Sequence, residues 1–208
     1  MKYLLFSTTK GLVKKTSLEE YASIRRSGLV AIRLDSGDQL LAVRPTSGKD
    51  LIMLVTAHGK AIKFKETDIR PTGRATRGVR GIKIKKGDQV VSMQVIGKQK
   101  NEASPIPDQL LVVTEHGFGK RTSLLEYSTQ GRGGQGVFTA KINEKTGKIV
   151  NAHLVAGCDN QSDLLIISKA GKIIRLPLSQ VPQLGRHTQG VRLFRLDPGD
   201  AVASLTLL

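Results

Sequence analysis

The sequence is poor in aromatic residues and in cysteine. Its 208 residues include 3 Tyr, 5 Phe and no Trp, so we expect an aliphatic core. Cys158 is the only cysteine, which excludes an internal disulfide and a cysteine-rich zinc site and is typical of a reducing compartment. No apolar run approaches the roughly 20 residues that a membrane helix needs, and residues 3–6 are too short an apolar stretch for a signal peptide. We therefore expect a soluble, cytoplasmic protein.

Acidic residues are few relative to basic ones. There are 17 Asp and Glu against 33 Lys and Arg, which gives a formal net charge of +16. Hydrophobic residues make up 39% of the chain, enough to bury a core at this length, and this excludes a disordered basic tail. A folded chain with such an excess of positive charge favours a polyanion as its partner.

The chain repeats one plan four times. Each copy starts with a short apolar run and a turn glycine, and Gly11, Gly59, Gly117 and Gly171 lie about fifty residues apart. A second apolar and basic run, a basic loop with glycine and two further apolar runs complete each copy. The runs are rich in Val, Ile and Leu and are bounded by Gly, Asp or Ser, which predicts strands. The predicted third strands are residues 30–34, 81–84, 137–142 and 191–196, and the predicted fourth strands are residues 40–44, 90–96, 149–155 and 201–207.

Four repeats of about four strands each predict an all-β, propeller-like array in a single domain. The predicted blades are residues 1–48, 49–97, 108–157 and 158–208, and residues 98–107, with Pro105 and Pro107, form a linker. Residues 17–26 alone approach a helical pattern, and they predict one turn of helix at most. Residues 1–48, 49–97, 98–157 and 158–208 carry +4, +7, +3 and +2, so every repeat is net basic and we expect a long path of contact.

Several sequence strings occur in a recognisable order. They are Gly11-Leu12-Val13-Lys14-Lys15-Thr16, then Val79-Arg80-Gly81-Ile82 before Gly87-Asp88, then Gly119-Lys120-Arg121-Thr122, then Gly185-Arg186-His187-Thr188-Gln189-Gly190-Val191. In order and spacing they resemble the C-terminal domain of the bacterial DNA gyrase A subunit, from about residue 3 to the end. The A-type subunit of topoisomerase IV has a related domain and stays open as an alternative.

This resemblance implies a β-pinwheel, a propeller-like disc with strands exchanged between blades and a basic rim that bends DNA around itself. In gyrase, that wrap presents a crossover to the strand-passage machinery, which introduces negative supercoils. The implied partners are double-stranded DNA, gyrase B and the rest of the gyrase A subunit, at the nucleoid of a bacterium. The chain itself would be a monomer without catalysis, because the cleavage tyrosine and the ATPase lie in other parts of the enzyme.

The sequence departs from the family in two respects. It contains four repeats instead of the six usual in the family, so we expect a fragment or a shortened homologue. The gyrase A box, Gln-Arg-Arg-Gly-Gly-Lys-Gly, is not intact. The nearest string is Gln130-Gly131-Arg132-Gly133-Gly134-Gln135-Gly136, which lacks one Arg and the Lys. We interpret it as the degenerate loop of the third repeat.

We expect DNA contacts from basic residues in and near the glycine loops. Lys and Arg neutralise phosphates, and glycine lets backbone amides approach the duplex. The candidates are Lys14, Lys15, Arg25, Arg26, Lys63, Lys65, Arg74, Arg77, Arg80, Lys120, Arg121, Arg132, Arg175, Arg186 and Arg192. No base-reading array is visible, so binding should be largely sequence-tolerant and sensitive to how easily the DNA bends.

Other reactive side chains have simpler interpretations. Tyr3, Tyr21 and Tyr127 are expected to pack, and the scattered His58, His116, His153 and His187 predict no metal site. Asp38, Asp88 and Asp200 recur in Gly-Asp turns, where carboxylates bind nearby backbone. No Walker loop is present, so no nucleotide cofactor is expected. A propeller scaffold that binds acidic proteins or RNA is the rival from another class, and it would need an apolar, aromatic face.

Overall fold

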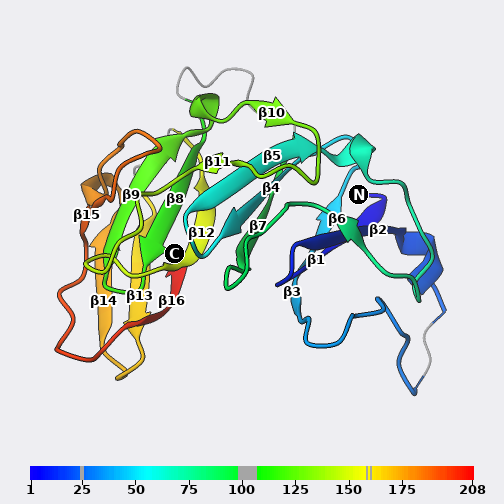
Figure 1. Ribbon diagram of the computed structural model, residues 1–208, viewed down its shortest axis with the longest axis horizontal. Helices are drawn as coiled ribbons and strands as arrows, with labels where there is room; N and C mark the ends of the chain where they lie inside the picture. Colours follow the sequence, from blue (N-terminus) through cyan, green and yellow to red (C-terminus); the bar gives the residue numbers. More distant parts are fainter. Residues whose placement is uncertain (24–25, 98–106, 158, 160) are drawn as a thin grey trace. The chain divides into compact units, whose positions relative to one another are not determined.

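The computed structural model describes residues 1–23, 26–97, 107–157, 159 and 161–208 (Figure 1). This part of the chain consists of strands, loops and short 3-10 helices, which confirms the all-β prediction. The predicted helical turn is the 3-10 helix η1 (Leu18–Tyr21). Three further turns follow the second strand of their repeats: η2 (Glu66–Asp68), η3 (Leu124–Glu126) and η4 (Leu178–Gln180). No helix in these residues is long and apolar enough to cross a membrane.

The strands form four sheets in which nearly all strand pairs are antiparallel. The first has the order β3-β1-β2-β6, with β1 (Tyr3–Thr8), β2 (Leu12–Ser17), β3 (Leu40–Thr46) and β6 (Val79–Arg80). The second has the order β10-β5-β4-β7, and β11 also pairs with β5. Its strands are β4 (Leu51–Thr56), β5 (Lys60–Lys65), β7 (Val90–Ile96), β10 (Thr129–Gln130) and β11 (Val137–Phe138).

In the third and fourth sheets, as in the first two, the first strand of the repeat lies between the second strand and the outer strand. The third is β12-β8-β9-β15, with β8 (Gln109–Thr114), β9 (Phe118–Ser123), β12 (Ile149–Val155) and β15 (Val191–Arg192). The fourth is β14-β13-β16, with β13 (Asp163–Ser168), β14 (Ile173–Pro177) and β16 (Val202–Leu207). The predicted fourth strands 90–96 and 149–155 coincide with β7 and β12, and the other two differ from β3 and β16 by one or two residues at an end.

Strands are exchanged between consecutive repeats. In the first three sheets, β2, β5 and β9 each pair with a two-residue strand from the following repeat, namely β6, β11 and β15. Figure 1 shows β6 beside β2. This is the exchange that the resemblance implied.

The predicted third strands were wrong in length and place. Residues 30–34 contain a single bridge at Arg33, residues 81–84 follow β6, and only the first two residues of 137–142 and 191–196 form strands. The ladder ends early because two successive amides share one carbonyl: Gly81 and Ile82 both donate to the oxygen of Gly11, at 2.8 and 3.3 Å. The chain then bends and buries Ile82.

The described residues form two compact units. One comprises Met1–Leu54, Ile62–Lys100 and Thr129–Gly136, and the other comprises Val55–Ala61, Asn101–Ser128 and Val137–Leu208. Each has its own core of mostly Val, Ile and Leu, with Phe64 in the first and Phe194 in the second. The predicted aliphatic core is confirmed.

Candidate nucleic-acid interface

A hollow of about 540 Å³ in the first unit is lined by basic, acidic and apolar side chains. Its cations are Lys10, Arg77, Arg80, Lys83, Lys85 and Lys86, its acids are Asp35 and Asp88, and its apolar residues are Leu12, Ile82 and Ile84. The hollow lies where β6 ends and the following loop turns back at Gly87, whose φ is 80°. Six cations against two carboxylates make a concave surface that attracts anions.

One ion pair inside this hollow orients a predicted contact residue. The Arg77 Nη2 atom lies 2.8 Å from Asp35 Oδ2, and both side chains are exposed to solvent. An exposed pair of this kind contributes little to stability. Arg77 therefore stays available to a stronger anionic ligand.

The second unit has a hollow of about 370 Å³ at the corresponding place in its own sheets. The correspondence rests on strand register, since Leu12 pairs with Arg80 in the first unit and Phe118 pairs with Arg192 in the second. The second hollow is lined by His116, Arg192, Leu196, Asp197, Gly199, Asp200 and Ala201. It has one arginine against two carboxylates, so it attracts anions less strongly. Asp197 also forms an ion pair with Lys172.

Three of the predicted DNA contacts lie inside the protein. Lys14, Lys15 and Lys120 are at most 4% exposed. The ammonium of Lys14 donates to Thr16 Oγ1 at 2.6 Å and to Ala31 O at 2.8 Å, and burial lowers its pKa. For these three residues the surface prediction was wrong. The reason is that β2 and β9 are covered on both faces, which strand alternation does not reveal.

Lys120 is the most completely enclosed of the three. Its Nζ atom donates to Gly185 O at 2.6 Å, to Arg186 O at 2.7 Å and to Thr188 Oγ1 at 3.0 Å. All three protons of the ammonium are thereby used. Burial lowers the pKa of Lys120 to about 8, and the neighbouring Glu126 opposes this effect. Lys120 thus holds the basic loop of the fourth repeat against β9.

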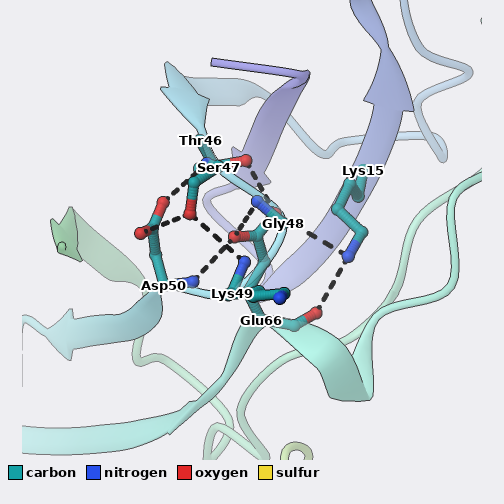
Figure 2. Close-up of polar contacts among 7 residues, drawn as sticks. All are labelled: Lys15, Thr46, Ser47, Gly48, Lys49, Asp50 and Glu66. Carbon is teal, nitrogen blue, oxygen red and sulfur yellow. Dashed lines mark hydrogen bonds and ion pairs between the residues drawn. The ribbon is translucent and has the colours of Figure 1, made fainter. Parts of the chain in front are cut away.

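Lys15 belongs to a buried polar network, shown in Figure 2. Its Nζ atom lies 3.7 Å from Glu66 Oε1 and donates to Glu66 O at 3.2 Å. The Glu66 carboxylate, 0% exposed, also accepts from Thr46 Oγ1 at 2.7 Å, Gly48 N at 2.9 Å and Asp50 N at 3.1 Å. In Figure 2, Lys15 reaches the carboxylate from β2, and Gly48 and Asp50 reach it from the turn after β3. The network joins the first repeat to η2 of the second.

Two of the arginines predicted to contact DNA donate hydrogen bonds from their guanidinium groups to backbone carbonyls of the protein. Arg132 donates from Nε to Asp68 O at 2.9 Å and from Nη1 to Arg80 O at 3.1 Å. Arg186 donates from Nη1 to Phe138 O at 3.3 Å. Arg80 and Phe138 are the last residues of the exchanged strands β6 and β11. Arg132 and Arg186 therefore bind equivalent carbonyl groups in successive repeats. Each arginine comes from a loop of the next repeat and holds the end of an exchanged strand by a hydrogen bond.

The box-like loop formed by residues 130–136 is also engaged in packing. Gln130 lies in β10 beside Phe64 of β5. The Gly133 amide donates to Gly81 O at 2.7 Å, and the Gly134 carbonyl accepts from Lys83 N at 2.8 Å. These partners belong to the second repeat, so the loop packs on the sheet of the repeat before its own.

The remaining candidates differ in accessibility. Arg26, Lys65, Arg77, Arg80 and Arg192 are exposed. Lys63, Arg74 and Arg121 are partly buried, and Arg121 Nε donates to Val181 O at 2.8 Å. Exposed Arg175 pairs with Asp163, and the atoms Nη2 and Oδ2 lie 2.5 Å apart. Arg25, like Cys158 and most of the predicted linker, lies outside the described residues.

Sequence reasoning missed four lysines of the first hollow. They are Lys10, Lys83, Lys85 and Lys86. A signal was present, since residues 83–86 form a basic run directly before the Gly-Asp turn. It was missed because it lies beyond the glycine loop, at the end of the predicted strand 81–84 and in the two residues that follow it.

The tyrosines and the turn aspartates lie as predicted. Tyr127 is buried, its hydroxyl lies 2.5 Å from Thr139 Oγ1, and burial raises its pKa to about 12. Asp38 accepts from the amides of Lys10 and Gln39, and Asp200 accepts from two amides in the same way. Within the described ranges, no three His, Cys, Asp or Glu side chains group as metal ligands.

Comparison with known proteins gives a consistent result. A family profile described as "DNA gyrase C-terminal domain, beta-propeller" matches residues 2–47, 50–96, 108–156 and 162–208. The DNA gyrase A protein of Staphylococcus epidermidis is 42% identical over 203 residues, and that of Staphylococcus aureus is 41% identical. In both cases the match covers 98% of this chain and 22% of the relative. The chain therefore spans about a fifth of the length of these curated relatives.

Solved structures show the same fold. The C-terminal domain of DNA topoisomerase IV superposes with a TM-score of 0.89 at 26% identity, covering 100% of this chain and 62% of the other. A DNA gyrase A C-terminal domain superposes with a TM-score of 0.83 at 27% identity, covering 99% and 65%.

Proposed function

The chain belongs to the family of DNA gyrase C-terminal domains, and we propose on this basis that it binds duplex DNA and bends it along its basic surfaces. The hollow with six cations against two carboxylates is the observation that carries the proposal. Basic side chains that contact phosphates release counterions, and this gain offsets the elastic cost of bending the duplex. Binding of this kind is largely independent of base sequence.

We further propose that the chain works as a part of gyrase. The curated relatives and the family profile support gyrase A over the corresponding protein of topoisomerase IV. The partners are then gyrase B and the rest of gyrase A, in a bacterial cytoplasm at the nucleoid. DNA cleavage and ATP hydrolysis belong to those other parts, and this chain supplies the DNA wrap.

The structure refines the set of proposed contacts. Exposed members of the predicted set are retained, buried ones are removed, and the newly found lysines are added. The primary contacts are Lys10, Arg26, Lys65, Arg77, Arg80, Lys83, Lys85, Lys86 and Arg192. Lys63, Arg74, Arg121, Arg132, Arg175 and Arg186 remain secondary candidates, and Arg121, Arg132, Arg175 and Arg186 already bind protein oxygens.

Salt-dependent DNA binding tests the proposal. If about 6–10 phosphates are contacted, the affinity for a fluorescent duplex should fall roughly 10³–10⁵-fold between 50 and 200 mM salt. The double variant Lys85→Glu with Lys86→Glu should weaken binding of every duplex and reduce the salt slope by about 2. Lys2→Glu with Lys49→Glu changes the net charge equally at exposed sites outside the hollow and is the matched control. A flat salt dependence, or equal effects of the two pairs, would contradict the proposal.

A further inference from the structure

The three exchanged strands meet their host sheets in one geometry. Directly after each turn glycine, the first residue of the host strand pairs with the last residue of the exchanged strand. The pairs are Leu12 with Arg80, Lys60 with Phe138, and Phe118 with Arg192. Antiparallel partners of this kind have adjacent side chains on one face of the sheet.

Each of these cross-strand pairs combines one cation with one apolar side chain. In the third sheet, the Arg192 Cζ atom lies 5.4 Å from the centre of the Phe118 ring. In the second sheet, the Lys60 Nζ atom lies 3.6 Å from the centre of the Phe138 ring. The cation has therefore changed strands in the second sheet. Equivalent positions in the repeats read Arg80, Phe138 and Arg192, so the sequence alone shows a missing cation there.

The charges of the three cations remain available. In the part of the chain that the structure describes, none of Lys60, Arg80 and Arg192 has a carboxylate within ion-pair distance. The Phe138 side chain is 48% exposed, so the pair of Lys60 and Phe138 lies at the surface. A cation held over a ring face keeps its full charge and loses side-chain freedom.

Two side chains of the fourth repeat contact Phe138. The His187 ring centre lies 5.1 Å from that of Phe138, and Arg186 binds the Phe138 carbonyl. The Arg80 carbonyl is bound in the same way by Arg132, so an arginine of the next repeat lies at both junctions.

We propose that Lys60, held by the Phe138 ring, is the DNA-phosphate contact of the second sheet and takes the place that Arg80 and Arg192 have in the first and third. This inference rests on the proposed function and adds a contact residue that comparison of equivalent sequence positions does not reveal. Each exchanged-strand junction then offers one cation to the DNA backbone.

Five variants test the assignment in the same salt-dependent binding assay. Lys60→Gln should reduce the salt slope by about 1 and weaken binding as Arg192→Gln does. Lys141→Gln removes an exposed charge from the same unit and should leave the slope unchanged. The exchange Lys60→Phe with Phe138→Arg copies the third junction, so it should restore the slope that Lys60→Phe alone loses. Thermal unfolding checks that each variant is folded.

The possible failures are distinguishable. If wild-type protein does not bind DNA, the proposed function is overturned and this inference with it. If the wild type binds and Lys60→Gln matches Lys141→Gln, the inference alone is overturned. The same holds if the exchanged pair binds as weakly as Lys60→Phe, because the cation would then have no role at that junction.

Discussion

At the scale of single residues, a basic side chain can be buried instead of lying at the surface. Lys15 is buried beside Glu66, whose carboxylate receives three further hydrogen bonds, two from Thr46 and Gly48 of the first repeat and one from the Asp50 amide. Desolvation of two charges is costly, and the remaining partners compensate for it. Removal of one member would leave the other charge buried without its counterion.

Glu66→Gln should therefore destabilise the fold strongly. The amide directs its NH₂ group toward other donors and leaves the buried Lys15 ammonium without a counterion, so we expect a loss of about 3–5 kcal/mol in the free energy of unfolding. Urea unfolding measures this change. Glu144→Gln, at an exposed loop position, is the control and should change stability by less than about 0.5 kcal/mol. A loss below about 1 kcal/mol for Glu66→Gln would contradict the account of the network.

Lys120 predicts a pH effect of defined sign. Burial lowers its pKa to about 8 from 10.5, so the unfolded chain holds this proton more tightly than the folded chain. Between these two values the unfolded state binds more protons, and the contribution of Lys120 to the free energy of unfolding rises with pH. Relative to Lys120→Met, which does not titrate, the wild type should gain stability from about pH 7.5 to about pH 10. Urea unfolding of both proteins at several pH values measures the difference, and a constant difference would contradict the lowered pKa.

At the scale of elements, the turn glycines set the strand exchange. Gly117 has a φ of 75°, and a Cβ atom there would overlap the carbonyl oxygen of Phe194 from the following repeat. Gly171 has a φ of 84° and follows β13 in the same way, but a Cβ atom there would meet no atom within 4 Å. The two glycines thus share a backbone conformation and differ in whether another repeat lies against them.

The variants Gly117→Ala and Gly171→Ala separate these two effects. Both place alanine in the left-handed region, which costs about 1–2 kcal/mol. Gly117→Ala must also displace the chain next to β15, so it should cost at least about 2 kcal/mol more. Denaturant unfolding measures both costs. Equal costs would mean that the exchanged strand does not depend on close approach at the glycine.

The elements show what sequence predicts well and what it does not. Short apolar runs between turn residues located the outer strands β7 and β12 to the residue. The exchanged strands were misplaced because their length depends on a partner in another repeat. The same dependence concealed Lys60, whose link to Phe138 exists only in the pairing of β5 with β11. Arg77 and Arg80 were selected as candidate DNA contacts because they lie beside Gly78 and Gly81 in a loop, and both are exposed.

For the whole molecule, net charge alone does not determine the balance of charges in each hollow. The chain carries +16, yet the hollow lined by Arg192 also contains Asp197 and Asp200. Asp200 stabilises its turn, because its carboxylate accepts hydrogen bonds from two backbone amides. The Asp197 carboxylate accepts from no backbone amide in the described contacts, and it pairs with exposed Lys172.

Asp197→Asn should therefore strengthen DNA binding. Removal of this charge frees Lys172 and lowers the repulsion of phosphate at Arg192, so we expect about a 3-fold gain in affinity at low salt, reduced at high salt. Glu144→Gln changes the net charge equally at an exposed loop and controls for the general effect. Fluorescence anisotropy with a labelled duplex measures both, and equal gains would contradict a specific role for Asp197.

The central claim is that this chain bends DNA around itself, and circle ligation tests it most directly. Nicked circular DNA is ligated with increasing amounts of the protein, the protein is removed, and the topoisomer distribution is read on a gel. We expect a shift toward positive linking number that grows with the amount of protein and is lost with the Lys85→Glu and Lys86→Glu pair. An unchanged distribution at concentrations that bind all circles in a gel-shift assay would contradict the wrap.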